Sequence, residues 1–295
     1  MELRVLRYFL AVAREQTISG AAELLHISQP TLSRQLMDLE DELGKSLFIR
    51  GNRKITLTEE GMFLRKRAQE ILDLVEKTTA EFSTDDELIG GDIFIGGGET
   101  DAMRLLAQIA HDLQKQYPEI RYHLFSGNGD DVIDHLDKGL IDFGVLIDPA
   151  DITKYDFIRI PAKDTWGVLM RKDSPLASKT QIEASDLTSL PIITSRQTMV
   201  NEQMTKWLGH DFDELNIVST YNLVFNASLL VEQGMGYALC LDKLINTTGD
   251  SRLCFRPLFP PLESHLVVVW KKYQVFSKAA EKFISCMKDT FHAQS

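Results

Sequence analysis

The sequence predicts an all-α N-terminal region with a short hairpin and a long helix, followed by a larger α/β region. Three observations predict this fold class: apolar residues at helical spacing through roughly the first 45 positions, a second such run from 61 to 82, and apolar strands alternating with helical segments after 88. A chain of 295 residues is long for one compact unit, so we expect two domains or more. The hydrophobic content of 44% and the charged content of 25% are typical of globular proteins and exclude a wholly disordered chain.

The net charge of −11 is distributed unevenly along the chain. Residues 1–68 hold 11 Lys+Arg against 9 Asp+Glu, whereas the remaining 227 residues hold 21 against 34. Phosphate repels acidic protein surfaces, so contact with nucleic acid would belong to the N-terminal part.

No apolar run approaches the roughly 20 residues of a membrane span, the longest being short runs such as Leu266–Trp270. The N-terminal stretch carries Arg4, Arg7 and Arg14, so it lacks the apolar core of an export signal. We therefore expect a cytoplasmic chain without membrane contact.

The three cysteines, Cys240, Cys254 and Cys286, form no CxxC pair. Buried free thiols are expected, and a redox-sensing Cys240–Cys254 pair is the alternative.

Three helices follow one another at the N-terminus. Leu6, Phe9, Leu10 and Ala13 mark one face of the first, and Ile18, Ala21, Ala22 and Leu25 mark the second, which Thr17 or Ser19 can cap. The third begins after Ser28, a favoured N-cap, carries Pro30 in its first turn and ends near Gly44. The tight connection between the second and third helices predicts a helix-turn-helix at about residues 18–37.

The third helix separates an apolar face, Leu32 to Leu43, from a polar face with Arg34 near its start. In a helix-turn-helix, the early residues of this helix meet base edges in the major groove. Arg34 can donate two hydrogen bonds to guanine, and Gln29 or Gln35 can pair with adenine. The alternative is an ordinary solvated helix face.

Two short strands are predicted at Leu47–Arg50 and Lys54–Leu57, around a turn of Gly51-Asn52-Arg53. Arg50, Arg53 and Lys54 gather at its tip. A basic hairpin directly after such a helix is typical of a wing whose cations reach phosphates or the minor groove.

The stretch from Leu6 to Thr58 resembles the N-terminal domain of LysR-type transcriptional regulators. The residues that carry the resemblance are Leu6-Arg7-Tyr8-Phe9, Ala21-Ala22, Leu25-His26-Ile27-Ser28-Gln29-Pro30, Leu32-Ser33-Arg34-Gln35, Leu39-Glu40, Glu42-Leu43-Gly44, Leu47-Phe48 and Leu57-Thr58-Glu59-Glu60-Gly61. The resemblance implies a regulator that binds double-stranded DNA and, where it activates, contacts RNA polymerase.

The resemblance also implies base contacts by Gln29, Pro30, Ser33 and Arg34, with the duplex positioned by Thr31, Arg50 and Arg53. Many relatives carry Ala where this chain has Thr31. The complete set of candidate DNA-binding residues is Thr17, Ser28, Gln29, Pro30, Thr31, Ser33, Arg34, Arg50, Arg53 and Lys54.

A helix from Thr58 to Phe82 has apolar or small residues at alternating three- and four-residue steps, as in a coiled coil. Its candidate dimerisation residues are Leu64, Ala68, Ile71, Val75 and Phe82, and Gly61 and Thr78 are weak members of the pattern. The alternative is an amphipathic helix packed on its own domain. The family's linker helices pair antiparallel, so the resemblance favours a homodimer or homotetramer on a pseudo-palindromic operator.

The domains are therefore expected at 1–58 (winged helix-turn-helix), 59–87 (linker helix and hinge) and 88–295 (α/β). In the last, strand–helix–strand order predicts parallel sheets covered on both sides. Fragments such as Asp142-Phe143-Gly144-Val145 and Asp173-Ser174-Pro175-Leu176 extend the resemblance. It implies an effector domain with two subdomains, like those of periplasmic solute-binding proteins, at 88–160 with 265–295 and at 161–264, with crossovers near Pro161 and Glu263.

In open α/β sheets, ligands bind beyond the carboxyl ends of the strands. This rule selects the candidate effector-binding residues Gly98, Glu99, Thr100, Ser126, Asn128, Asp148, Ser195, Arg196 and Thr198. Arg196 would suit an anionic small molecule, but Glu99, Asp101 and Asp148 would repel one. An amine-bearing effector, a neutral effector or none is therefore open.

The sequence contains no GxSxG, GxGxxG, P-loop or HExxH motif, and no i, i+4 histidine pair. We therefore expect neither catalysis nor a cofactor or metal. The rival interpretation is an enzyme or a transport-type solute binder with an accessory DNA-binding domain.

Overall fold

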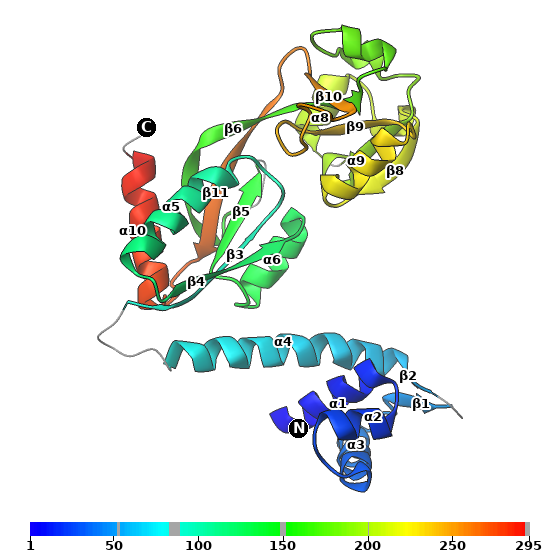
Figure 1. Cartoon of the computed structure of the whole chain (residues 1–295), viewed down its shortest axis with the longest axis vertical. Coiled ribbons are helices and arrows are strands. Elements are labelled where there is room, and N and C mark those ends of the chain that lie inside the picture. The colour runs from blue at the N-terminus through cyan, green and yellow to red at the C-terminus, as the bar shows by residue number, and fades with distance from the viewer. Residues whose placement is uncertain (52–53, 83–88, 148–151, 200, 293–295) are drawn as a thin grey trace. The chain divides into compact units, whose positions relative to one another are not determined.

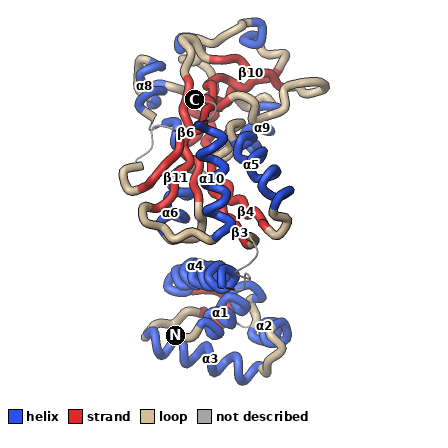
Figure 2. Tube along the Cα trace, turned by 90° about the vertical axis from the view of Figure 1, so that its left-hand side faces the viewer, coloured by secondary structure: helices blue, strands red, loops and turns tan. Residues whose placement is uncertain are grey.

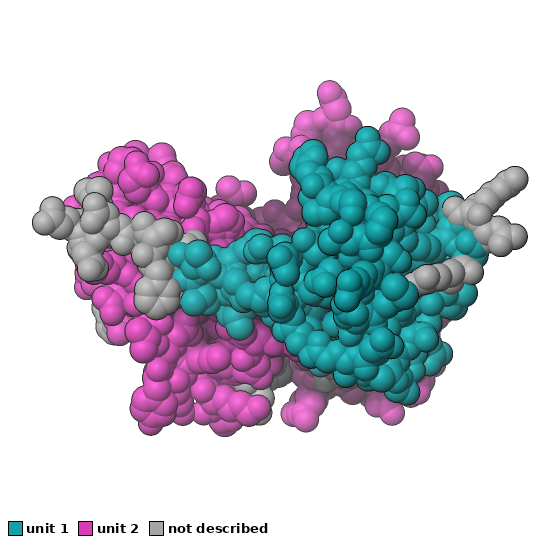
Figure 3. All heavy atoms as spheres, turned by 90° about the horizontal axis from the view of Figure 1, so that it is seen from below, with its two compact units in different colours: residues 1–83 teal, residues 84–295 magenta. Residues whose placement is uncertain are grey.

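A computed structural model describes residues 1–51, 54–82, 89–147, 152–199 and 201–292. The chain divides into two compact units, Met1–Ser83 and Thr84–Ser295, which Figure 3 colours separately. The first unit includes the long helix that the sequence predicts within residues 59–87.

Unit 1 begins with three helices, α1 (Leu3–Glu15), α2 (Ile18–Leu24) and α3 (Gln29–Leu43). Thr17 caps α2, Ser28 caps α3, and Gly44 ends α3 in the left-handed region at φ 61°. These local signals lie where the sequence predicts them, so the helix-turn-helix is confirmed as a fold element. Beneath the helices lies a core that includes Leu6, Phe9, Val12, Ala21, Leu32, Leu36 and Leu39.

The wing consists of β1 (Phe48–Arg50) and β2 (Ile55–Leu57), paired antiparallel with Phe48 opposite Leu57. Leu47 and Phe48 are buried in the same core as the helices, whereas Ile49 is exposed. The wing is thus joined to the helical domain by its base.

The long helix α4 (Glu59–Phe82) carries the predicted dimerisation residues. Leu64 (8% exposed) and Ala68 (0%) are buried in the core of their own unit together with Leu72, and Ile71 packs partly against that core. Leu64 and Ala68 thus pack within their own unit, as expected for the alternative of an amphipathic helix that packs on its own domain. Val75 is half-buried, and the side chain of Phe82 lies outside the described residues. A three- and four-residue spacing marks an apolar stripe without identifying the surface that covers it.

Unit 2 is built on one mixed sheet with the strand order β4-β3-β5-β11-β6-β9-β7-β8, and β10 pairs with β6 off this path. The strands are β3 (Gly91–Gly97), β4 (Ile120–Ser126), β5 (Phe143–Ile147), β6 (Tyr155–Arg171), β7 (Ile192–Ser195), β8 (Ile217–Tyr221), β9 (Tyr237–Leu241), β10 (Leu253–Pro257) and β11 (Glu263–Lys271). The helices are α5 (Met103–Gln116), α6 (Gly129–Asp137), α7 (Arg196–Met199), α8 (Glu202–Leu208), α9 (Val224–Glu232) and α10 (Lys278–His292), with short 3₁₀ turns at Pro175–Ser178, Ala184–Asp186 and Phe212–Glu214.

Two subdomains share this sheet. In subdomain I, α5 and α10 pack together on one face of the strands and α6 lies on the other (Figures 1 and 2). Subdomain II surrounds β7, β8 and β9 with α8 and α9. The two-subdomain α/β architecture expected from the sequence is confirmed.

The crossover between the subdomains lies later than Pro161. A single strand, β6, runs through this stretch; it pairs with β11 up to Thr165 and with β9 from Trp166. Pro161 is tolerated because the β6–β11 register shifts between His265 and Val267, opposite this stretch. The sheet is mixed and not purely parallel, because the chain returns through β11. Strand β11 runs antiparallel to both β5 and β6, and β6 also runs antiparallel to β9.

Among the described residues, no helix is long and apolar enough to cross a bilayer.

Candidate nucleic-acid interface and ligand cleft

The start of α3 is held by a local cap. The Ser28 Oγ accepts a hydrogen bond from the Thr31 N–H (3.3 Å) and lies 2.8 Å from the Thr31 Oγ1. This arrangement leaves Gln29, Pro30 and Thr31 exposed on the first turn. Ser28 therefore orders the turn on which the predicted contact residues stand.

Arg34 is exposed one turn further along the same helix, whereas Ser33 is half-buried. Within the described part of the chain, Arg34 has no ion-pair or hydrogen-bond partner. Leu32 and Leu36, beneath it, are buried and fix the helix on the domain. The guanidinium is thus presented on a rigid support, with its donors available to a ligand.

Thr17 has a capping role that bears on its predicted DNA contact. Its Oγ1 accepts a hydrogen bond from the Gly20 N–H (3.2 Å), and the residue is half-buried. The hydroxyl is therefore used within the protein to begin α2.

The wing is tied to α3 by Glu40, a residue that the sequence reasoning did not assign to the site. Its Oε1 accepts hydrogen bonds from the Leu47 N–H (2.6 Å) and the Phe48 N–H (3.3 Å). Of the predicted wing cations, Lys54 is exposed; Arg50 is a β1 residue whose side chain lies outside the described part, and Arg53 lies outside it entirely.

The junction of wing and α4 depends on Thr58 and Gly61, also missed as functional positions. The Thr58 Oγ1 donates to the Ser46 carbonyl (2.8 Å) and accepts from the Gly61 N–H (2.9 Å). An N-cap threonine three residues before a glycine is the sequence signal that could have identified this junction.

A cleft of about 370 Å³ lies between the two subdomains of unit 2. Five of the nine predicted effector residues line it: Gly98, Glu99, Asn128, Ser195 and Thr198. The other lining residues are Gly127, Gly129, Asp130, Ile133, Val145, Leu146, Ile147, Trp166, Gln197, Asn201, Tyr221, Asn222, Val224, Leu241 and Leu244. The strand-end rule therefore identified the cleft but missed its aromatic wall, which comes from β6 and β8.

Capping hydrogen bonds at the starts of helices fix the orientation of polar side chains in the cleft. The Asn128 Oδ1 accepts from the Asp131 N–H (2.9 Å) at the start of α6, and the Asp131 Oδ2 accepts from the Asn128 N–H (3.2 Å). The Ser195 Oγ accepts from the Thr198 N–H (3.0 Å) and lies 2.6 Å from the Thr198 Oγ1. These side chains are positioned by the fold before any ligand is present.

Two contacts cross the cleft between the subdomains. The Glu99 Oε2, from the loop after β3, accepts a hydrogen bond from the Val224 N–H at the first turn of α9. The Gln197 amide approaches Gly129 so closely that a Cβ on the glycine would lie 2.6 Å from the Gln197 Nε2. Glu99 thus joins the subdomains directly.

Three predicted effector residues lie outside the cleft lining, and Asp148 lies outside the described residues. Thr100 (7% exposed) directs its hydroxyl to the Ala102 N–H (3.0 Å) and to the Asp164 carboxyl. Ser126 lines, with Thr100, a neighbouring hollow of about 370 Å³, and Arg196 is exposed and lies in neither lining. Position at a strand end therefore did not determine the direction of these side chains.

Asp164 is a buried carboxyl close to the crossover. Burial raises its pKa, and the negative charges of Asp101 and Asp242 add to this effect, while the Thr100 hydrogen bond opposes it. Its Oδ2 has no hydrogen-bond partner among the described residues. The carboxyl is thus held in surroundings that disfavour its charge.

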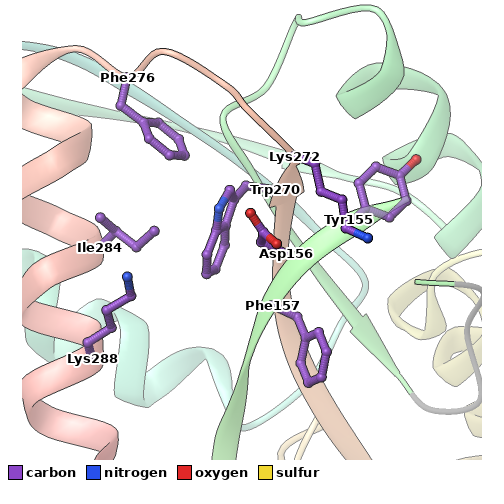
Figure 4. A pocket seen from close by; sticks show the side chains of 8 residues that line it. All are labelled: Tyr155, Asp156, Phe157, Trp270, Lys272, Phe276, Ile284 and Lys288. Atoms are coloured by element: carbon purple, nitrogen blue, oxygen red, sulfur yellow. The ribbon is translucent and has the colours of Figure 1, made fainter. Parts of the chain in front are cut away.

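A separate hollow of about 600 Å³ lies on subdomain I between α10 and the ends of β6 and β11 (Figure 4). Trp270, Phe276 and Ile284 form its apolar side, and Lys272 and Lys288 stand at its edge. Unlike the cleft, this hollow therefore carries cationic side chains.

Among the described residues, the cysteines form no disulfide and the possible metal ligands form no metal site. Cys240 and Cys254 are buried free thiols and Cys286 is a half-buried one. No group of three or more His, Cys, Asp or Glu side chains in the described part is arranged to hold a metal ion.

Comparisons with known proteins assign both units to the same protein family. Residues 3–62 match the family model of the bacterial regulatory helix-turn-helix proteins of the lysR family, and residues 87–292 match the model of the LysR substrate binding domain. The HTH-type transcriptional regulator BsdA of Bacillus subtilis (strain 168) is 32% identical over 199 residues, 66% of this chain and 67% of its own.

Further similarities extend over nearly the whole chain. The Hca operon transcriptional activator HcaR of Escherichia coli (strain K12) is 27% identical over 297 residues, covering 98% of each chain. The crystal structure of full-length CbnR complexed with its target DNA superposes with a TM-score of 0.77 at 19% identity, covering 100% of both chains. The order of the two domains along the chain is therefore shared with these proteins.

Proposed function

The chain belongs to the LysR family of bacterial transcription regulators, and we propose that it reads a pseudo-palindromic operator with the exposed start of α3 while a small molecule in the cleft sets its output. The proposal rests chiefly on Arg34, a cation without a partner among the described residues, on a helix that is capped and packed on the core. Such a group matches the bidentate recognition of guanine in the major groove.

Gln29, Pro30, Ser33 and Arg34 read base edges in this proposal. Thr31, Arg50, Arg53 and Lys54 position the duplex through its phosphates. Thr17 and Ser28 act indirectly, because their oxygens hold the starts of α2 and α3 and so set the orientation of the neighbouring groups.

The test of the DNA interface is an electrophoretic mobility shift on the DNA that flanks the protein's own coding sequence. Arg34→Ala should weaken binding by about 1–3 kcal/mol and relax the preference at one base position. Arg65→Ala, an exposed arginine on α4, is the matched control. Equal weakening on all sequences would make Arg34 a phosphate contact and contradict base reading.

The operator is bound by a homodimer, or a homotetramer built from it, in which α4 pairs with its copy through Phe63 and Leu74. Phe63 is 66% exposed and Leu74 41% exposed. They are 11 residues apart, three turns of helix, and therefore lie on the same side. This pair replaces Leu64 and Ala68, which the unit's own core covers.

The effector occupies the cleft and shifts the balance between two arrangements of the subdomains. Asn222→Trp, at an exposed lining position, should block the cleft and abolish the response of a reporter gene to its inducing condition, with operator binding retained. A normal response in that variant would contradict an effector in the cleft.

The protein works as a regulator without catalysis, in the cytoplasm where its operator lies, and contacts RNA polymerase at promoters that it activates. The family match supports this assignment, as does the similarity to HcaR, which is named a transcriptional activator.

A further inference from the structure

The charge of the cleft lining has one sign. Among the described residues that line it, Glu99 and Asp130 carry charge, and none is Lys, Arg or His. The cation among the predicted effector residues, Arg196, is exposed and lies outside the lining. Lys243 lines the neighbouring hollow, with its Nζ 3.8 Å from an Asp101 carboxylate oxygen. The cleft therefore presents negative charge to an occupant.

The helix starts at the cleft already hold oxygens of the chain itself. The N-terminus of a helix ordinarily attracts an anion, because its first N–H groups lack partners. Here the Glu99 carboxylate accepts from the Val224 N–H at the start of α9, and the Asn128–Asp131 capping box occupies the start of α6. An anionic ligand would have to displace a carboxylate from α9 and approach a second one at α6.

Two aromatic residues, Trp166 and Tyr221, line the cleft beside aliphatic ones such as Leu241. The Trp166 Nε1–H donates to the Ser264 Oγ (2.8 Å), and the Tyr221 hydroxyl donates to the Leu239 carbonyl (2.6 Å). Both polar atoms are used within the protein, so these side chains offer the cleft their rings. Aromatic rings attract cations and pack well against apolar groups.

We propose that the effector is an organic amine with an apolar body, its ammonium group held by Glu99 and Asp130 and its body packed on Trp166 and Tyr221. This inference rests on the proposed function, in which the cleft is the effector site. Because Glu99 also caps α9 across the cleft, an ammonium bound to its carboxylate acts directly on the contact between the subdomains.

The experiment measures thermal unfolding and calorimetric titration of the full chain with two probes of similar shape and opposite charge, phenethylamine and 3-phenylpropionate. The amine should raise the unfolding temperature in a dose-dependent manner, and the acid should not. Glu99→Gln/Asp130→Asn should weaken amine binding at least tenfold. It removes both charges, while the glutamine oxygen can still accept from the Val224 N–H.

Two control variants separate the possible outcomes. Lys272→Ala/Lys288→Ala, at the hollow of Figure 4, should leave amine binding unchanged. Asn222→Trp should abolish it, because the cleft is blocked. Acid binding that exceeds amine binding and is lost in Asn222→Trp would overturn the effector class and leave the cleft as effector site. Lack of amine binding at millimolar concentration would also overturn the class. A normal reporter response in Asn222→Trp would instead overturn the part of the proposed function that places an effector in the cleft.

Discussion

Gly61 lies so close to Leu47 that a Cβ on the glycine would stand 2.1 Å from the Leu47 carbonyl oxygen. The same carbonyl accepts a hydrogen bond from the Thr58 N–H (3.0 Å), so the base of the wing and the start of α4 form one junction. Only a residue without a side chain permits this approach of helix to strand.

Gly61→Ala should therefore destabilise unit 1 by about 1–3 kcal/mol, because the wing strand has to move to admit the methyl group. Circular dichroism melting of the full chain would measure the loss, and weaker operator binding should accompany it. Met62→Ala, at the exposed neighbouring position, should leave both properties nearly unchanged. A melting curve unaltered by Gly61→Ala would contradict the close junction.

Aspartate substitutions on the two faces of α4 should have different effects on folding and on oligomeric state. Phe63→Asp/Leu74→Asp should yield folded monomers in analytical ultracentrifugation, because it places charge on the proposed pairing face. Leu64→Asp should instead unfold unit 1, since it buries a charge in the core. Gln69→Asp, at an exposed position on another side of the helix, is the control. Unchanged sedimentation of the Phe63/Leu74 variant would exclude this face as the interface.

Asp164 should make unit 2 less stable as the pH rises. Burial holds its folded-state pKa above the ordinary value, so its contribution to stability is fully present below the unfolded-state pKa and is lost as the pH rises through the raised value. Asp164→Asn does not titrate at this position. The unfolding temperature of the variant minus that of the wild type should therefore increase from acidic to neutral pH.

Asp92 provides the control of opposite sign. Burial raises its pKa, but hydrogen bonds from His123 (2.8 Å) and Arg121 (3.0 Å) outweigh this effect and lower it overall. Its stabilising contribution is therefore present above the ordinary pKa and is lost as the pH falls through the lowered value. Asp92→Asn should accordingly lose stability relative to the wild type as the pH rises, and the same trend in both variants would contradict the assignment of Asp164.

The three thiols should differ in alkylation. Burial raises the pKa of Cys240 to about 12 and also raises that of Cys254, and the thiolate is the reactive form. Iodoacetamide at about pH 8, near the ordinary thiol pKa, should label half-buried Cys286 first. Mass spectrometry of native and denatured protein would identify the sites. Cys286→Ser should leave the native protein almost unlabelled, and rapid labelling of Cys240 would be contrary to its burial.

The sequence predicts the elements of unit 1 well because their signals are local: Ser28 and Gly44 each specify a helix end without reference to distant residues. The direction of Thr100 was not predictable in this way, because its partner Asp164 lies on a strand far along the chain. The surface that covers Leu64 could not be predicted either, since helical spacing shows an apolar stripe but not what packs against it. The position of Trp166 in the cleft could not be predicted because it depends on β6 being continuous across both subdomains.

The Glu40 carboxylate accepts hydrogen bonds from both the Leu47 and the Phe48 N–H groups and thereby fixes the distance between α3 and the wing. The entropy of ordering these two elements is lost when the protein folds rather than when it meets DNA. Adjustment on binding then falls to the duplex, so base steps that bend or narrow easily should be favoured even where no side chain touches them. We expect Glu40 to influence the choice of sequence in this way, through the wing strand that it holds.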